Sequence, residues 1–287
     1  MKNFKIKSFS KVNLSLRVVK KLKNNYHNII SLITFSDPHD IISISEVNGS
    51  KDKISFSGKF KKGIQLKNNT ITKALYLLRK KKLLKNQSFQ INIKKNIPHG
   101  AGLGGGSSNA ANILNFFNKK IGFKLKKKNI IRLAEKIGFD VQINLERKNT
   151  FLNGKKGEML RLGKKFKLDL LIVYPNIICS TKKIYSKNKK ISSMKSYPAF
   201  NMQNKRKLID YLSEETNDLQ DAVIKIYPKI GKLIDYIKSQ KGCRFSRITG
   251  SGSTCIGIFS NKRNAINAQR MVKLKYPKYW CAVSKTI

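Results

Sequence analysis

A glycine-rich stretch contains the residues of this chain whose types and spacing are best suited to chemistry. Residues 97–108 read Ile-Pro-His-Gly-Ala-Gly-Leu-Gly-Gly-Gly-Ser-Ser. Glycine has no Cβ and readily adopts a positive φ, so this run lets backbone N–H groups converge and lets a ligand approach closely. An alternating strand pattern at 89–94 precedes it, and a helix pattern follows, with an apolar face of Ala110, Ile113, Leu114 and Phe117.

A strand, a glycine loop and a helix N-terminus in that order are typical of an anion site. Unpaired N–H groups and the helix dipole both favour negative charge there. The alternative is a flexible turn, but an ordinary turn needs only one or two glycines. We therefore interpret the stretch as a phosphate cradle.

Three better-known phosphate patterns do not fit the loop. The dinucleotide fingerprint requires an acidic residue ~20 positions later, where this chain has lysines around Leu125. The P-loop requires a lysine directly after its glycines, and none follows here. The lysine strand, HRD and DFG motifs of protein kinases are also missing. A different phosphate-binding loop is therefore predicted.

Composition sets the class of protein. The 287 residues carry 61 Lys and Arg against 15 Asp and Glu, a net charge of +46. Such a charge could indicate a nucleic-acid binder. However, the lysines are spread over the whole length and far outnumber the arginines that specific readers use. We favour a compositional bias, while a positive field would still attract a polyphosphate ligand.

Several features indicate a cytoplasmic protein. The chain has no apolar run long enough to cross a membrane, and its start, Met-Lys-Asn-Phe-Lys-Ile-Lys, has no apolar signal-peptide region. Its four cysteines are scattered without Cys-x-x-Cys spacing. This spacing argues against zinc and disulfide frameworks and suits a reducing compartment.

Three further places could supply side chains to a site. Lys11 and Asn13 share one face of a predicted strand, either as site residues or as a solvated face. Tyr26-His27 is the one place where an aromatic residue adjoins a histidine, although a lone histidine often has a structural role. Asp140 is an acid flanked by apolar residues after a predicted helix at 127–137. It is functional, or it is a turn aspartate.

The remaining pattern predicts an α/β chain. Strands are predicted at 29–34, 41–44 and 54–56, with a turn at Asp37–Asp40, and a helix from Asn69-Thr70. A hairpin edge at 150–154 and a buried strand at 168–174 follow. Next come a short helix at 182–185 and a long exposed loop. The last third predicts a helix over 226–237, strands at 244–248 and 254–259 around a second glycine turn, a helix capped by Asn261, and a strand at 278–283.

Three stretches in this order resemble the GHMP small-molecule kinases. Ser10–Leu14 resembles their first motif, usually Ala-Lys-Ile-Asn-Leu; Pro98–Ser108 matches the second; Ile248–Ser253 resembles the third. The resemblance spans nearly the whole chain. It implies an α/β (α+β) fold of two domains. The first is a ribosomal-S5-like, ATP-binding domain at 1–157, and the second is a ferredoxin-like domain at 158–287.

Three other stretches resemble the branch of that family whose substrate is a methylerythritol linked to cytidine diphosphate. They are Asn25-Tyr26-His27, Ile137–Val141 and Asn217-Asp218-Leu219. Two departures occur: Asn24-Asn25 replaces an Asp-Gly turn, and Gln142 replaces a proline. The resemblance implies ATP-dependent phosphorylation of the 2-hydroxyl of that substrate in the non-mevalonate isoprenoid pathway.

The resemblance also implies the site residues. Asp140 would take the hydroxyl proton, and Lys11 beside it would stabilise charge on the incoming oxygen and the γ-phosphate. ATP would be bound by Pro98, Gly100, Gly102, Leu103, Gly104, Gly105, Gly106, Ser107 and Ser108. The substrate would be bound by Asn13, Tyr26, His27, Thr181, Tyr185, Gly250, Ser251 and Gly252, with cytosine between the two tyrosines. Mg²⁺ is expected with ATP, held by phosphates and water rather than by protein ligands.

The expected partner is therefore a small molecule, with no specific nucleic acid and no membrane, and the expected assembly is a monomer or homodimer. Two alternatives stay open. One is another GHMP kinase, acting on homoserine or mevalonate, although Tyr26-His27 would then have no base to stack on. The other is a basic nucleic-acid-binding protein with the S5-like fold.

Overall fold

The computed structural model describes residues 3–22, 27–154, 158–163, 165–194 and 204–287. Its residues form two compact units that interleave along the chain. The first unit comprises Met1–Lys11, Pro38–His99 and Gly104–Arg147, and the second comprises Val12–Asp37, Gly100–Leu103 and Lys148–Ile287. A division of the family's two domains at 157/158 stays a prediction, because these units do not follow a single cut in the sequence.

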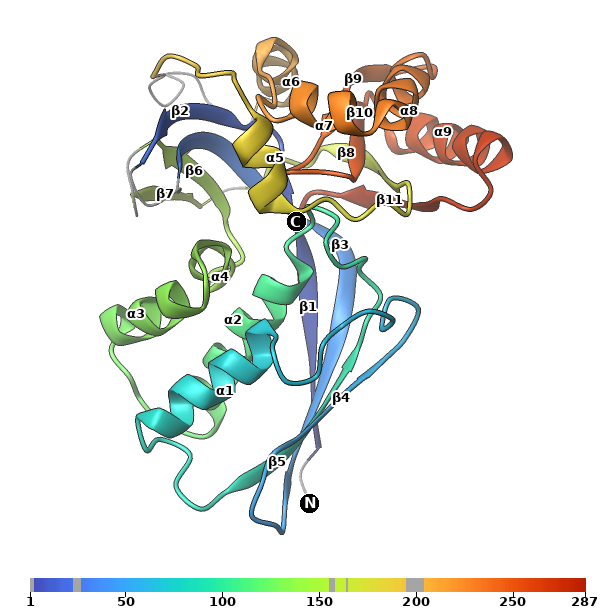
Figure 1. The fold of residues 1–287 in the computed structure, drawn as a ribbon. Helices are drawn as coiled ribbons and strands as arrows, with labels where there is room; N and C mark the ends of the chain where they lie inside the picture. The colour runs from blue at the N-terminus through green and yellow to red at the C-terminus, as the bar shows by residue number, and fades with distance from the viewer. Residues whose placement is uncertain (1–2, 23–26, 155–157, 164, 195–203) are drawn as a thin grey trace. The chain divides into compact units, whose positions relative to one another are not determined.

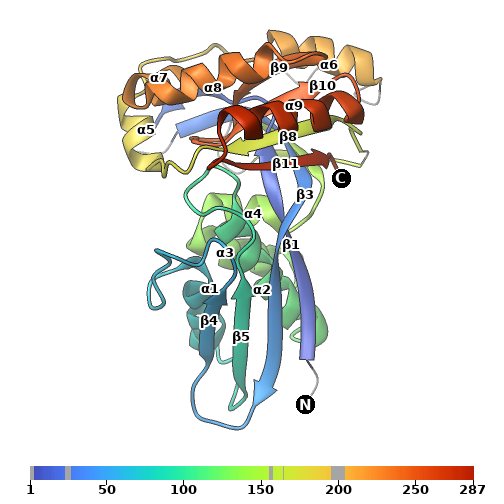
Figure 2. The ribbon, with the colours of Figure 1, turned by 90° about the vertical axis from the view of Figure 1, so that its right-hand side faces the viewer.

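The first unit is a sheet with helices on one face (Figure 1, Figure 2). The end of β3 (His27–Val47) pairs antiparallel with β5 (Ser88–Lys94), from Ile41 opposite Lys94 to Val47 opposite Ser88. β4 (Lys53–Ser57) is parallel to β5, and β1 (Asn3–Asn13) pairs with β3. The predicted alternation of β5 is confirmed, because Phe89, Ile91 and Ile93 are buried.

Three helices close the core of this unit. α1 (Thr70–Lys80) is capped by Asn69, whose side chain accepts from the N–H groups of Ile71 and Thr72. α2 (Gly105–Lys120) follows the glycine loop, and α3 (Lys127–Ile137) ends at Gly138. A short helix, α4 (Phe139–Asn144), comes directly after it. The apolar face predicted for α2 is confirmed: it is buried and consists of Ala110, Ile113, Leu114 and Phe117.

The second unit contains a four-stranded antiparallel sheet in the order β11-β8-β10-β9. These strands are β8 (Asp169–Tyr174), β9 (Cys243–Ile248), β10 (Cys255–Phe259) and β11 (Trp280–Lys285). β8 is buried along its whole length, as its apolar run predicts. α8 (Pro228–Lys238) and α9 (Lys262–Lys275) pack on this sheet, with α9 against β8 and β11 (Figure 2).

The other strands of the second unit pair with the start of β3. Arg17 and Lys21 of β2 (Arg17–Lys21) lie opposite Ile30 and His27. β6 (Asn149–Asn153) pairs with β3 and, as an antiparallel hairpin, with β7 (Met159–Leu162). The unit also holds α5 (Thr181–Lys187), α6 (Lys205–Glu214) and α7 (Gln220–Ile226).

One prediction about local structure is wrong, and one helix was not predicted. Residues Asp37–Asp40 form no turn, because β3 runs through them without interruption. Pro38 lies between the residues paired with β6 and those paired with β5, where its missing N–H costs no bond in either ladder. No helix was predicted at 205–214, where α6 lies with a buried face of Leu208, Ile209 and Leu212.

Among the described residues, no helix is both long and apolar enough to span a membrane.

Candidate active site

The glycine loop adopts the backbone conformation that its composition predicts. Gly100, Gly102 and Gly104 have φ values of 64°, 80° and 64°, a region that side chains with a Cβ rarely adopt. Gly104 is the N-cap of α2, and no side chain caps this helix end. The first N–H groups of a helix have no intrahelical partner, so the start of α2 is suited to bind an anion.

Close approach to neighbouring atoms also restricts two positions in the loop. A Cβ on Gly104 would lie 3.2 Å from Lys11 Cε, in the first unit. A Cβ on Gly102, in the second unit, would collide with the carbonyl oxygen of Thr249 and lie 3.0 Å from that of Gly252. The loop therefore has no room for a side chain at Gly102, and a side chain at Gly104 would displace Lys11.

Other contacts fix the first turn of α2 and limit which groups face a ligand. The Ser108 N–H donates to the Gly104 carbonyl at 2.8 Å, and its hydroxyl accepts from Ser8 at 2.9 Å. The Thr70 hydroxyl donates to the Gly106 carbonyl at 2.8 Å. Since Ser108 is buried and already bonded, the N–H groups of the preceding loop residues fit phosphate best.

The two predicted catalytic side chains meet in the first unit. Lys11 Nζ lies 3.4 Å from Asp140 Oδ2, and their side chains are 5% and 46% exposed. Lys11 projects from β1, and Asp140 occupies the first turn of α4, directly after the end of α3. The Asn144 amide donates to the Asp140 carbonyl at 2.6 Å, which fixes that turn. The carboxylate is therefore accessible, while the ammonium is held in a buried position.

A buried ion pair near the start of α2 was not predicted from the sequence. Asp40 is fully buried and pairs with Lys95. Its Oδ1 accepts from the backbone N–H groups of Asn96 and Ile97 at 2.8 and 2.9 Å, and its Oδ2 accepts from Asn109 at 2.9 Å. Asp40 thus ties the segment before the glycine loop to α2. The available signal was an acid directly before an apolar strand run, Ile41-Ile42.

In the second unit, His27 and Tyr185 come together although they are far apart in sequence. Their ring centroids are 4.6 Å apart, with the planes tilted by 32°. Burial lowers the pKa of His27 from its usual 6.5, and the positive charge of Lys21 lowers it further. The imidazole is therefore neutral near pH 7. Tyr26, predicted as the partner of Tyr185, lies outside the described residues.

The other predicted substrate residues also gather in the second unit. The hydroxyls of Thr181 and Ser251 lie 2.9 Å apart. The backbone N–H of Asn13 donates to the Thr249 hydroxyl at 2.8 Å, and the side-chain amide of Asn13 donates to the Ser31 hydroxyl at 2.8 Å. A Cβ on Gly250 would lie 3.4 Å from Asn13 Oδ1. These contacts bring the first and third sequence motifs together.

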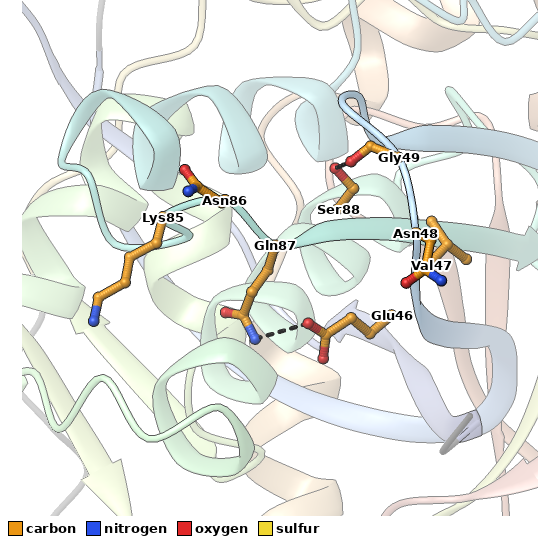
Figure 3. A pocket seen from close by; sticks show the side chains of 8 residues that line it. All are labelled: Glu46, Val47, Asn48, Gly49, Lys85, Asn86, Gln87 and Ser88. Carbon is orange, nitrogen blue, oxygen red and sulfur yellow. Dashed lines mark hydrogen bonds between the residues drawn. The ribbon is translucent and has the colours of Figure 1, made fainter.

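One hollow lies apart from all these residues, at the other end of β5 in the first unit. It has a volume of about 550 Å³ and is lined by Glu46, Val47, Asn48, Gly49, Lys85, Asn86, Gln87 and Ser88 (Figure 3). β5 begins at Ser88 and the glycine loop follows its end, so the two are roughly 20 Å apart at ~3.3 Å per residue. None of the predicted site residues lines it.

Among the described residues, no three His, Cys, Asp or Glu side chains form a group that could hold a metal ion.

Comparisons with known proteins identify the family. A model of the GHMP kinases N-terminal domain matches residues 69–146, and one of the GHMP kinases C-terminal domain matches 196–278. The chain is 41% identical to the 4-diphosphocytidyl-2-C-methyl-D-erythritol kinase of Pelagibacter ubique, over 100% of both chains. It is 31% identical to that of Wolbachia pipientis, again over 100% of both chains.

The chain belongs to the GHMP kinases and, within them, to the family of these relatives. It is therefore an ATP-dependent small-molecule kinase, as the sequence motifs predict.

Solved structures show the same fold. A 4-(cytidine 5′-diphospho)-2C-methyl-D-erythritol kinase has a TM-score of 0.77 at 20% identity, covering 98% of this chain and 99% of that one. The homoserine kinase of Cytophaga hutchinsonii has a TM-score of 0.72 at 16% identity, covering 100% and 95%. At these identities the likeness concerns the fold alone. The predicted two-domain GHMP kinase fold is confirmed.

Proposed function

We propose that this kinase transfers the γ-phosphate of ATP to the 2-hydroxyl of 4-diphosphocytidyl-2-C-methyl-D-erythritol, in the non-mevalonate pathway to isoprenoid precursors. The observation that carries the proposal is the 3.4 Å pair of Lys11 and Asp140 beside Gly104, at the uncapped start of α2. The 41% identity to a kinase of that name supports the choice of substrate.

The pair can perform the proton transfer that the reaction needs. Asp140 accepts the proton of the substrate's 2-hydroxyl while the oxygen of that hydroxyl bonds to the γ-phosphorus. The bond between the γ-phosphorus and the bridging oxygen breaks, and ADP leaves with its electrons. Lys11 donates hydrogen bonds to the incoming oxygen and the γ-phosphate, which stabilises the charge that develops there. Because Asp140 is 46% exposed, a substrate hydroxyl can reach it.

The glycine loop supplies the groups for phosphate. The N–H groups of Gly104 to Ser107 would bind the β- and γ-phosphates, and Pro98, Gly100, Gly102 and Leu103 would shape the loop. Mg²⁺ is expected to arrive with ATP, bound to phosphate oxygens and water, as this ion prefers.

The cytidine end of the substrate would be recognised in the second unit. We assign base stacking to Tyr26 and Tyr185, and recognition of the base edge to the neutral imidazole of His27. Contacts to the rest of the substrate are assigned to the group of Asn13, Thr181, Gly250, Ser251 and Gly252. Base–aromatic stacking is worth about 1–3 kcal/mol per base.

We further propose that the protein works in the cytoplasm as a monomer or homodimer, without specific nucleic-acid or membrane partners. Its four cysteines, all of them described, are free thiols, which suits a reducing compartment.

One assay tests the substrate. Transfer of labelled γ-phosphate from ATP is measured with the cytidyl substrate, mevalonate and homoserine in parallel. We expect turnover of the cytidyl substrate to exceed that of the other two by orders of magnitude. Equal or greater turnover of mevalonate or homoserine would refute the proposal and favour another GHMP kinase.

A further inference from the structure

Asp218 is a buried carboxylate in the second unit, outside the residues assigned to the site. It is 1% exposed, in a chain with only 15 acidic residues. It lies in Asn217-Asp218-Leu219, just before α7. A buried carboxylate costs several kcal/mol unless it is paired and hydrogen-bonded, so its bonding partners indicate its role.

Four donors converge on this carboxylate. Oδ2 accepts from the Val18 N–H at 2.8 Å and from the Ser192 hydroxyl at 2.7 Å. Oδ1 accepts from the Thr216 hydroxyl at 3.0 Å, and Lys190 Nζ lies 3.4 Å from it. Asp218 therefore joins β2 to residues 188–194, the segment after α5 that we call the strap.

The strap itself is bonded to the same point of β2. The Ser192 N–H donates to the Val18 carbonyl at 2.8 Å. Val18 lies opposite Ile29 of β3 in the β2–β3 ladder. The Asp218 carboxylate thus satisfies the N–H of Val18, and the Ser192 N–H satisfies its carbonyl. Together they supply the hydrogen bonds that a neighbouring strand would make to β2 at this residue.

These two anchored elements adjoin the elements that carry the paired rings, β3 for His27 and α5 for Tyr185. β2 ends at Lys21, which lies opposite His27, and the strap follows the helix that carries Tyr185. One carboxylate therefore fixes the backbone on both sides of the 4.6 Å pair of His27 and Tyr185.

We propose that Asp218 is a positioning residue that sets the spacing of His27 and Tyr185, and so the affinity for the cytidine end of the substrate. Asp218 does not touch the substrate. It acts by holding β2 and the strap together. This inference rests on the proposed function, because it assumes that the two rings bind the base.

The test uses Asp218→Asn. The amide keeps the shape of the side chain but replaces one acceptor oxygen by an NH₂ group. At the Oδ2 position this group cannot accept from Val18 and Ser192, and at the Oδ1 position it cannot accept from Thr216 and Lys190. Cytidine 5′-diphosphate probes the ring pair and ADP probes the glycine loop, each by calorimetry on the full chain. We expect the Kd for cytidine diphosphate to rise about tenfold, the effect of losing roughly one buried hydrogen bond, and that for ADP to change less than twofold.

A matched control separates positioning from general stability. Glu215 is also buried and lies three residues away, and it pairs with Arg17 of β2 at 2.6 Å. Glu215→Gln should lower the melting temperature without a selective loss of cytidine diphosphate affinity. Ser192→Ala removes one bond to Asp218 without changing a buried charge, and it should raise the Kd for cytidine diphosphate about threefold.

The outcomes are distinguishable. If wild-type protein binds cytidine diphosphate and His27→Ala does not weaken it, the base-recognition part of the proposed function fails. If His27→Ala weakens it while Asp218→Asn leaves it unchanged, or shifts cytidine diphosphate and ADP equally, the positioning role of Asp218 is overturned. Should Asp218→Asn not fold, Ser192→Ala decides, and an unchanged Kd there overturns the proposal.

Discussion

Replacing Asp140 by asparagine should remove most of the turnover while leaving the fold and ATP binding intact. The amide has the same shape as the carboxylate but cannot accept the hydroxyl proton. A positioned general base contributes about 10²–10⁴-fold to a rate, which corresponds to roughly 2.7–5.5 kcal/mol in the barrier. We therefore expect kcat to fall by about 10²–10⁴-fold.

The cost to stability should be small by comparison. The Asp140 side chain is 46% exposed and lies 3.4 Å from Lys11, so the pair is partly solvated. Ion pairs of exposed groups contribute about 0–1 kcal/mol. For a domain of this size, 1 kcal/mol shifts the melting temperature by about 2–4 °C.

Three measurements on one sample test this reasoning: steady-state turnover, ATP affinity by calorimetry, and the melting temperature. Glu135→Gln serves as the matched control, because Glu135 is an exposed carboxylate on α3 in the same unit, and it should turn over like wild type. Retention of more than half the wild-type kcat in Asp140→Asn would refute the assignment of Asp140 as the base.

Variants at three further positions give four more predictions. Gly104→Val should weaken ATP binding at least tenfold in a folded protein, because φ is 64° and a Cβ would lie 3.2 Å from Lys11 Cε; unchanged ATP affinity by calorimetry would contradict the phosphate cradle. His27→Ala should raise KM for the cytidyl substrate well above its effect on the KM for ATP, whereas equal shifts in the two KM values would count against base recognition. The pKa of His27 is lowered by burial, so its neutral form contributes stability that is present above about pH 6.5 and lost as the pH falls through the folded pKa. Between pH 7 and 5, the free energy of unfolding of His27→Ala should therefore fall by less than that of wild type in denaturation experiments. An equal fall in the two proteins would contradict this. Asp40→Asn leaves the ammonium of Lys95 buried without its carboxylate and should cost about 3–5 kcal/mol of unfolding free energy by chemical denaturation; a loss below ~1 kcal/mol would show that the pair is dispensable for the fold.

The sequence was sufficient wherever a local pattern determines the structure. Alternating Phe89, Ile91 and Ile93 predicted β5, and the 3.6-residue spacing after Gly106 predicted α2, because burial of one face follows from periodicity alone. The positive φ of Gly100, Gly102 and Gly104 was also predictable, since nothing else explains so dense a glycine run.

Predictions from local patterns were wrong where a contact with a distant residue determines the structure. Asp37–Asp40 has the composition of a turn, but the Asp40 carboxylate is held by Lys95 and Asn109, 55 and 69 residues away, and the chain stays extended. α6 was missed for a different reason. Its apolar face of Leu208, Ile209 and Leu212 comes directly after a basic run at 205–207, and the helical spacing of these three residues could have revealed it.

The same distinction separates the two kinds of site residue. The groups that we propose to bind phosphate are backbone N–H groups of consecutive residues, so their chemistry leaves a continuous motif that can be read directly. Groups that hold a site in shape leave none, because they act through bonds between distant segments. Asp218 bonds to Val18 across 200 residues, and its motif carries no local mark of that partner. Such a residue can be matched to a family from the sequence, but its proposed role of spacing His27 from Tyr185 follows only from the folded chain.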